Sequence, residues 1–156
     1  MKVNRRLMLK GATASGVLAA AASAGLLAPR AVLAAWPKAA FEAESFDDAL
    51  NAFAGSTDTS ASDDVKIKAP DIAENGAVVP ITVETSASDV ESISIIAKEN
   101  PSPLTSSFTL GKGAQGFVST RIKMGMTSDV VAVVKAGGKL LTATKEVKVT
   151  IGGCGG

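Results

Sequence analysis

The sequence predicts an all-β protein, an immunoglobulin-like antiparallel β-sandwich with one short helix before it. From residue 65 onward, apolar residues alternate with polar residues, which is the period of strands that bury one face. Glycine, proline and asparagine divide this part of the chain into about seven short segments. Hydrophobic residues make up 46% of the chain but aromatic residues only 4%, so the core must consist mainly of Val, Ile, Leu and Ala.

Residues 1–34 have the pattern of an export signal. Arg5 and Arg6 are followed by apolar residues and a lysine, which is typical of a twin-arginine signal. An Ala- and Gly-rich run that ends at Pro29 is followed by the small-residue spacing of a cleavage site at Val32 to Ala34. A transmembrane anchor is the alternative. The run is weakly apolar for a bilayer span of about 20 residues, so we expect no membrane anchor.

The charge of the chain changes when the predicted signal is removed. The full sequence has 16 basic and 15 acidic residues, a net charge of +1, but five of the basic residues lie in the leader. Residues 35–156 therefore carry 11 basic and 15 acidic residues, a net charge of −4. Nothing in this balance indicates a nucleic-acid partner. The twin-arginine route exports folded chains to the bacterial periplasm, which favours export together with a bound subunit that lacks its own signal.

The segment over residues 35–64 predicts a helix and a linker. Ser45 can cap a helix whose first turn carries two aspartates, where negative charge suits the helix dipole. Apolar residues follow at helical spacing, namely Phe46, Ala49, Leu50 and Phe53. Gly55 suits the end of a helix, so the helix is expected over about residues 39–54. The Ser-, Thr- and Asp-rich stretch after it is expected to be a loop.

The sandwich itself is predicted over residues 65–151. Its alternating apolar positions are Val65, Ile67, Val79, Ile81, Val83, Ile93, Ile95, Phe108, Leu110, Val118, Ile122, Leu141, Ala143, Val147, Val149 and Ile151. The continuous apolar run Val130 to Val134 indicates a strand that is buried on both faces. Gly137 and Gly138 predict a hairpin turn. Pro80, within an apolar run, indicates an edge strand or a bulge.

Two polar patterns have plain structural interpretations. Asn75 and Gly76 both tolerate left-handed backbone, so they predict a turn. Arg121 and Lys123 alternate with apolar neighbours, which predicts the solvated face of a strand. Docking of acidic or anionic partners is the alternative role for these two cations.

The chain ends in a cysteine framed by glycines. Cys154 is the only cysteine, and the sequence has no histidine. One chain therefore cannot form an internal disulfide, a His-based catalytic triad or a His- or Cys-rich metal site, and we expect no metal. Glycine has the widest backbone freedom, so residues 152–156 predict a flexible arm that can enter a narrow pocket of another protein. The glycines of this arm are Gly152, Gly153, Gly155 and Gly156.

The thiol of Cys154 lacks the features of an enzymatic nucleophile. Catalytic thiols are activated by a nearby base, cation or helix N-terminus, whereas the nearest charged side chain in sequence is that of Lys148. We therefore expect no enzyme activity and interpret Cys154 as a group on which other enzymes act. Two alternatives remain, a frayed terminus without function and a thiol that forms an intermolecular disulfide.

The C-terminal stretch from Val147 to Gly156 resembles that of the SoxY family, the sulfur carriers of the bacterial thiosulfate-oxidising (Sox) system. Three internal segments also resemble this family, over residues 69–80, 99–103 and 120–124. The twin-arginine leader agrees with it too. The resemblance spans essentially the whole chain that follows the signal.

This resemblance implies an immunoglobulin-like sandwich that forms a heterodimer with SoxZ, a partner without an export signal. It also implies that sulfur from thiosulfate becomes covalently attached to Cys154. SoxAX would make the attachment oxidatively, SoxB would hydrolyse the terminal sulfone group off as sulfate, and SoxCD, where present, would oxidise the remaining sulfur. The carrier would then need no cofactor of its own and would hold only sulfur adducts on Cys154.

Two other functions fit part of the sequence. The diglycine Gly155 and Gly156 also marks ubiquitin-like sulfur carriers, which bind sulfur as a thiocarboxylate. That chemistry needs ATP-dependent adenylation in the cytoplasm, so the export leader and the strand pattern argue against it. The second alternative is a structural binding module whose thiol only forms an intermolecular disulfide.

Overall fold

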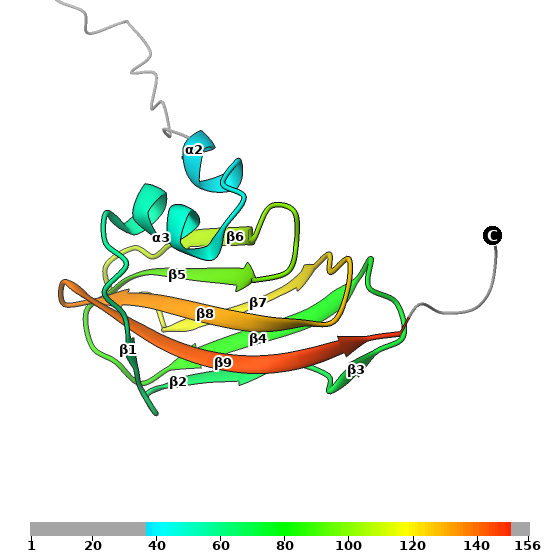
Figure 1. Ribbon diagram of the computed structural model, residues 1–156. Coiled ribbons are helices and arrows are strands. Elements are labelled where there is room, and N and C mark those ends of the chain that lie inside the picture. The colour runs from blue at the N-terminus through cyan, green and yellow to red at the C-terminus, as the bar shows by residue number, and fades with distance from the viewer. Residues whose placement is uncertain (1–36, 151–156) are drawn as a thin grey trace, which may run out of the picture. The chain divides into compact units, whose positions relative to one another are not determined.

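The computed structural model describes residues 37–150 of the chain (Figure 1). The predicted signal peptide over residues 1–34, with Arg5 and Arg6, lies outside the described residues. So does Ile151, the last apolar position predicted for the final strand.

Within this range the chain forms two short helices followed by nine strands. The helices are α2 (Lys38–Phe41) and α3 (Phe46–Ala54). The strands are β1 (Ser60–Ala61), β2 (Val65–Lys68), β3 (Ile72–Ala73), β4 (Val79–Thr85), β5 (Val90–Ala97), β6 (Leu104–Thr109), β7 (Phe117–Ile122), β8 (Ser128–Ala136) and β9 (Lys139–Val149).

The strands are arranged in two sheets. The larger sheet has the order β1-β9-β8-β5-β6, and β3 also pairs with β9. The smaller sheet has the order β2-β4-β7, and apolar residues of both sheets form one shared core. The predicted all-β class is confirmed, and two facing sheets of mostly antiparallel strands agree with an immunoglobulin-like sandwich.

The sequence predicted antiparallel pairing throughout the sandwich, and this prediction is wrong for two short strands. Strands β1 and β3 both run parallel to β9. They pair with it at different levels, β1 at Leu141 and Thr142, and β3 at Lys148 and Val149. These two short strands cover the edge of β9 that does not face β8, so its backbone groups find partners there.

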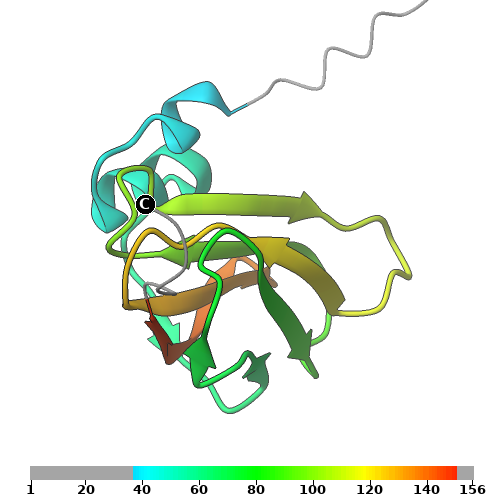
Figure 2. The same ribbon diagram turned by 90° about the vertical axis from the view of Figure 1, so that its right-hand side faces the viewer.

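The central strand β8 is buried on both faces, as its continuous apolar run predicted. Val130, Ala132 and Val134 pack into the core between the two sheets. Val131 and Val133 point to the other face, where they pack in a second cluster together with residues of α2 and α3. The helices therefore cover the outer face of the larger sheet, which Figures 1 and 2 both show.

The prediction of a single helix over residues 39–54 is wrong, because the chain forms two helices with a break at residues 42–45. Ser45 has an extended backbone, with φ −127° and ψ 158°, and its hydroxyl oxygen accepts a hydrogen bond from Asp48 N at 3.1 Å. A capping residue cannot itself be helical, so the predicted cap of α3 also ends any continuous helix. Gly55 ends α3 in the left-handed conformation, with φ +74°, as predicted.

A two-residue hairpin turn sets the direction of β9. Gly137 and Gly138 have φ values of +53° and +74° and join β8 to β9, with Ala136 opposite Lys139. Positive φ at both central residues is the requirement of a type I′ turn, which glycine meets without strain. The predicted turn is confirmed, and it places β9 alongside β8 along its whole length.

Pro80 lies in the central strand of the smaller sheet without a register shift, so the predicted edge strand or bulge is wrong. The N–H of Thr85 donates to Gly116 O on the β7 side at 2.8 Å. Successive N–H groups of a strand point in opposite directions, so position 80 faces β2 instead. Strand β2 ends at Lys68, opposite Thr82, so the missing N–H of the proline costs no ladder hydrogen bond.

Candidate functional site

The predicted sulfur-binding residue, Cys154, lies outside the described residues. The glycines predicted to form its arm lie outside them too, namely Gly152, Gly153, Gly155 and Gly156. The described chain ends at Thr150, four residues before Cys154. The part of the site that the structure describes is therefore the end of β9 and the segments around it.

Strand β3 holds one edge of β9 at this end. Lys148 N donates a hydrogen bond to Asp71 O at 3.0 Å, and Thr150 N donates to Ala73 O at 3.1 Å. The hydroxyl of Thr150 also lies 3.5 Å from Ala73 O. The parallel ladder therefore continues one residue beyond the last residue of β9, and it sets the position of Thr150.

The segment before β8 holds the other edge. Val149 N donates to the hydroxyl oxygen of Thr127 at 3.0 Å. Because neighbouring N–H groups of a strand point to opposite edges, the N–H groups of Val149 and Thr150 bind two different segments. The last two described residues are thus held from both sides.

Gly76 packs directly against this strand end. Its carbonyl oxygen accepts a hydrogen bond from Met124 N at 2.7 Å. A Cβ atom at position 76 would overlap the carbonyl oxygen of Met124 and would lie 2.9 Å from Cγ1 of Val149. Only glycine permits so close an approach of two backbone segments. The predicted turn is also confirmed, since the side-chain oxygen of Asn75 accepts from Ala77 N at 2.9 Å.

Asn100 ties two loops together at the same end, a role that the sequence alone did not assign. Its side-chain nitrogen donates to Lys123 O at 2.7 Å, and its side-chain oxygen accepts from Gly125 N at 3.0 Å. Together with the contact between Gly76 and Met124, these bonds bring three segments to one place, residues 69–80, 99–103 and 120–124. These are the three internal segments that resemble the SoxY family. They are far apart in the sequence but lie close together in the structure.

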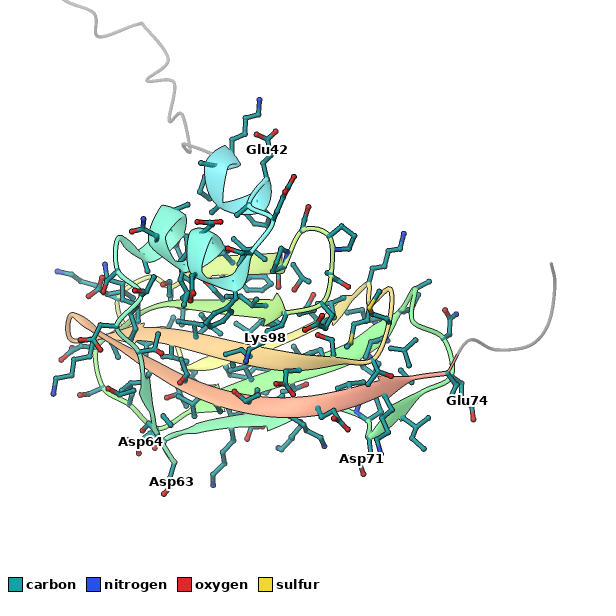
Figure 3. All side chains as sticks on the ribbon, viewed as in Figure 1. Glu42, Asp63, Asp64, Asp71, Glu74 and Lys98 are labelled. Carbon is teal, nitrogen blue, oxygen red and sulfur yellow. The ribbon has the colours of Figure 1, made fainter. Side chains whose placement is uncertain are left out.

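The surface at this end carries mixed charge. Arg121 and Lys123 are exposed while their apolar neighbours Ile122 and Met124 are buried, so the predicted solvated face is confirmed. Lys145 forms an ion pair with Asp71 at 3.0 Å and donates to Ala69 O at 2.7 Å. Figure 3 labels Asp71 and Glu74 at the end of the sandwich where β9 stops.

Three segments near this end each carry an exposed large apolar side chain. Ile72 is 57% exposed, Val78 50% and Met126 54%. Among the described residues one further large hydrophobic side chain is similarly exposed, that of Phe117 at 50%. Phe117 begins β7, whereas the end of β7 at Ile122 pairs with Val79, so Phe117 lies at the opposite end of this ladder from Val78.

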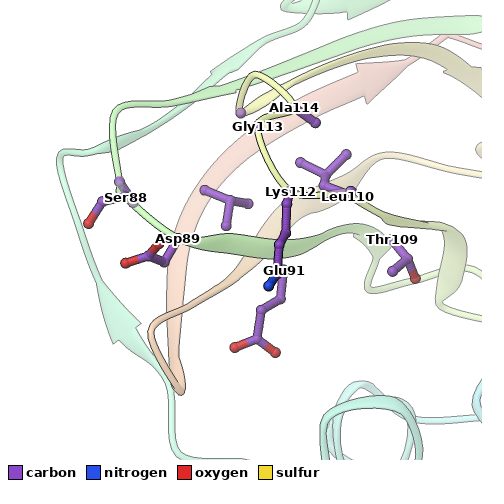
Figure 4. A pocket seen from close by; sticks show the side chains of 12 residues that line it. Ser88, Asp89, Glu91, Thr109, Leu110, Lys112, Gly113 and Ala114 are labelled. Carbon is purple, nitrogen blue, oxygen red and sulfur yellow. The ribbon is translucent and has the colours of Figure 1, made fainter.

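A hollow in the surface lies away from this end (Figure 4). It has a volume of about 890 Å³ and is lined by residues 87–91, residues 109–114 and Gly116. Asp89 O accepts from Gly137 N at 3.3 Å, which places the pocket beside the hairpin where β9 begins. The length of β9 separates it from Thr150 by about 30 Å. Residues 151–154 can span at most about 14 Å, so this pocket cannot receive the chain's own thiol.

Two further properties concern residues 37–150 alone. No three His, Cys, Asp or Glu side chains of this range are grouped so that they could hold a metal ion. Neither helix of this range has the length and the apolar character that crossing a bilayer requires.

Known proteins match the chain over this fold and beyond it. The family model "Sulfur oxidation protein SoxY" matches residues 50–154. The solved structure of the sulfur carrier protein SoxY from Chlorobium limicola f thiosulfatophilum is 48% identical. That match covers 67% of this chain and 96% of the other, with a TM-score of 0.62. No curated protein matches the chain.

A more distant structure, the superoxide reductase (neelaredoxin) from Ignicoccus hospitalis, is 17% identical with a TM-score of 0.49. It covers 55% of this chain and 80% of its own, and a similarity at that level carries no argument about function. The family model, in contrast, extends through the three converging segments and the end of β9 to position 154, the single cysteine. The chain therefore belongs to the SoxY family of sulfur oxidation proteins.

Proposed function

We propose that the protein is a periplasmic sulfur carrier of thiosulfate oxidation, which holds sulfur intermediates covalently on Cys154 and presents them to Sox enzymes. The observation that carries the proposal is that the family match reaches Cys154, the only thiol of the chain. The carrier performs no catalysis itself, and the enzymes that act on the adduct supply the base, the metal or the redox centre.

Each step changes the group that is bound to the sulfur of Cys154. In loading, the thiolate of Cys154 and thiosulfate join through a new S–S bond, and two electrons pass to the haem enzyme SoxAX. In hydrolysis by SoxB, water attacks the terminal sulfone group, sulfate leaves with the release of two protons, and a persulfide stays on Cys154. Where SoxCD is present, it oxidises the outer sulfur of the persulfide to a sulfonate with the oxygen of three water molecules, while six electrons pass to SoxCD and six protons are released.

The geometry at the end of β9 supports this role. Hydrogen bonds from two sides and the close packing of Gly76 hold the chain as far as Thr150. Beyond that point four of the last five residues are glycine, whose small size and backbone freedom suit entry into narrow enzyme pockets. A firmly held root followed by a glycine-rich arm suits a carrier that offers one sulfur to the pockets of several enzymes.

The wider setting follows from the same family membership and from the leader. The twin-arginine signal, with Arg5 and Arg6, would export the chain already folded, as a heterodimer with SoxZ that lacks a signal. In the periplasm the heterodimer would meet SoxAX, SoxB and SoxCD in turn. The proposal includes no bound cofactor, no nucleic acid and no membrane anchor.

Mass spectrometry of the intact protein from thiosulfate-grown cells tests the proposal, with the adduct located by fragmentation. We expect sulfur adducts on Cys154. An adduct on the C-terminal carboxyl group would instead indicate the thiocarboxylate chemistry of ubiquitin-like carriers. A chain that carries only intermolecular disulfides at Cys154 would indicate a structural binding module.

A further inference from the structure

The turn over residues 75–78 contains an asparagine that is followed by a glycine, and the carrier function assigns no chemistry to this pair. Asn75 O accepts a hydrogen bond from Val78 N at 3.3 Å, and Asn75 Oδ1 accepts one from Ala77 N at 2.9 Å. Asn75 is exposed and Gly76 is partly exposed. Water and hydroxide therefore reach the side-chain amide of Asn75 and the peptide bond that follows it.

The side-chain amide of Asn75 and the nitrogen of Gly76 can react with each other. When hydroxide removes the proton of Gly76 N, this nitrogen attacks Cγ of Asn75 and closes a succinimide ring. The bond from Cγ to the side-chain nitrogen breaks, and that nitrogen leaves as ammonia with protons from water. Water then opens the ring at either of its carbonyl groups, which gives aspartate or isoaspartate. The net reaction exchanges an amide nitrogen for an oxygen of water, so it needs no oxidant or reductant.

The structure leaves the attacking nitrogen available. Gly76 has no side chain that would shield its nitrogen from Asn75. Within residues 37–150, no acceptor takes a hydrogen bond from Gly76 N. The N–H of Ala77 already donates to Oδ1 of Asn75, the oxygen on which negative charge develops during the attack. A donor in this position stabilises the developing charge.

The two other asparagines of residues 37–150 lack this arrangement. Asn100 precedes Pro101, whose nitrogen carries no proton and cannot attack. Asn51 precedes Ala52 inside α3, where the backbone N–H groups donate to helix hydrogen bonds. The same chain therefore contains two internal controls for the reaction at Asn75.

We propose that Asn75 is a site of spontaneous deamidation, and that the isoaspartyl product loosens the end of β9. The inference goes beyond the proposed carrier function and does not depend on it.

The effect on β9 follows from the close packing of Gly76. Isoaspartate directs the main chain through the former side chain, so one more carbon atom precedes Gly76. The carbonyl oxygen of Gly76 accepts from Met124 N at 2.7 Å, and there is no room for a Cβ between Met124 O and Cγ1 of Val149. A longer backbone displaces Gly76 from these contacts. Ordinary aspartate keeps the length of the main chain, and its carboxylate still accepts from Ala77 N.

The first test follows the three asparagines in the purified protein without any substitution. The protein is incubated at mildly alkaline pH, and samples taken over time are digested and analysed by mass spectrometry. We expect the mass gain of an amide-to-acid exchange at residue 75, with isoaspartate at that position. The rate should rise in proportion to the hydroxide concentration. Asn51 and Asn100 should stay unmodified over the same period.

The second test measures the effect on the fold. The isoaspartyl form is separated by chromatography and compared with the unmodified chain and with Asn75→Asp, which has the same charge on a main chain of ordinary length. The amides of Val149 and Thr150 should exchange hydrogen about tenfold faster in the isoaspartyl form, because a displaced strand end opens more often. Asn75→Asp should behave like the unmodified chain.

Each half of the proposal has its own contrary result. Modification of Asn75 no faster than that of Asn51 would overturn the reactive site. Deamidation only in chains unfolded by urea would overturn it too, because the folded turn would then block the reaction. Equal hydrogen exchange in the isoaspartyl and unmodified chains would overturn the effect on β9. An equally large effect of Asn75→Asp would assign the loosening to charge and would also contradict the proposal.

Discussion

The carbonyl oxygen of Ala73 accepts hydrogen bonds from both the N–H and the hydroxyl of Thr150, at 3.1 and 3.5 Å. These contacts join residues 77 positions apart in the chain. They hold Thr150, the last described residue, and four further residues, 151–154, lead from it to the thiol of Cys154.

Cys154→Ser should abolish thiosulfate oxidation because an alcohol forms no S–S bond with thiosulfate. The substitution is small and follows the last described strand in the sequence, so the thermal unfolding midpoint and SoxZ binding should stay unchanged. Complementation of a strain that lacks the carrier gene measures thiosulfate oxidation. Calorimetry measures the unfolding midpoint, and co-purification measures SoxZ binding. Full complementation by the serine variant would contradict the carrier function.

Gly153→Trp should slow loading by SoxAX because the bulky side chain lies next to the reacting thiol and narrows the set of pockets that the arm can enter. Stability should not change. The matched control is Gly111→Trp, at a position where an added Cβ meets no atom within 4 Å and φ is not positive. Loading is followed as mass gain over time, and equal loading rates in the two variants would argue against a slender arm.

Gly76→Ala should destabilise the fold by about 1–3 kcal/mol, because the new Cβ overlaps the carbonyl oxygen of Met124 and crowds Val149. Gly111→Ala again serves as the control and should be neutral or slightly stabilising. Chemical denaturation gives the free energies of unfolding. Hydrogen exchange should also become faster at the amides of Val149 and Thr150, since their strand is the one displaced.

Asn100→Ala should also lower the free energy of unfolding, by about 1–3 kcal/mol. The variant loses both side-chain hydrogen bonds to the loop after β7, to Lys123 O and from Gly125 N. The control is Asn51→Ala on the exposed face of α3, where alanine favours the helix. An equal effect of the two substitutions on urea denaturation would show that the loop contacts contribute nothing.

Local signals in the sequence were enough for much of the fold. Positive φ at Gly137 and Gly138 and the cap at Ser45 depend on neighbouring residues only, so their residue types predict them. The apolar run from Val130 to Val134 likewise predicts burial on both faces. One local inference failed, because the helix periodicity around Ser45 hid the break that its cap imposes.

Other features depend on contacts between distant parts of the chain. A strand of two residues such as β3 is too short to show an alternation of apolar and polar residues in the sequence. Its parallel direction depends on its pairing with the edge of β9 that does not face β8. The position of Pro80 in a central strand depends on where β2 stops. Neither could be derived from local patterns, because the partners are far away in sequence.

For the site, the sequence by itself determined the available chemistry: one thiol, no histidine, and glycines on both sides of that thiol. The tertiary structure alone decided what surrounds the root of the arm. It brings residues 69–80, 99–103 and 120–124 to the end of β9 and leaves Ile72, Val78 and Met126 exposed. The physical reason is that the identity of a residue specifies its chemistry, whereas exposure and neighbourhood arise only when distant segments pack together.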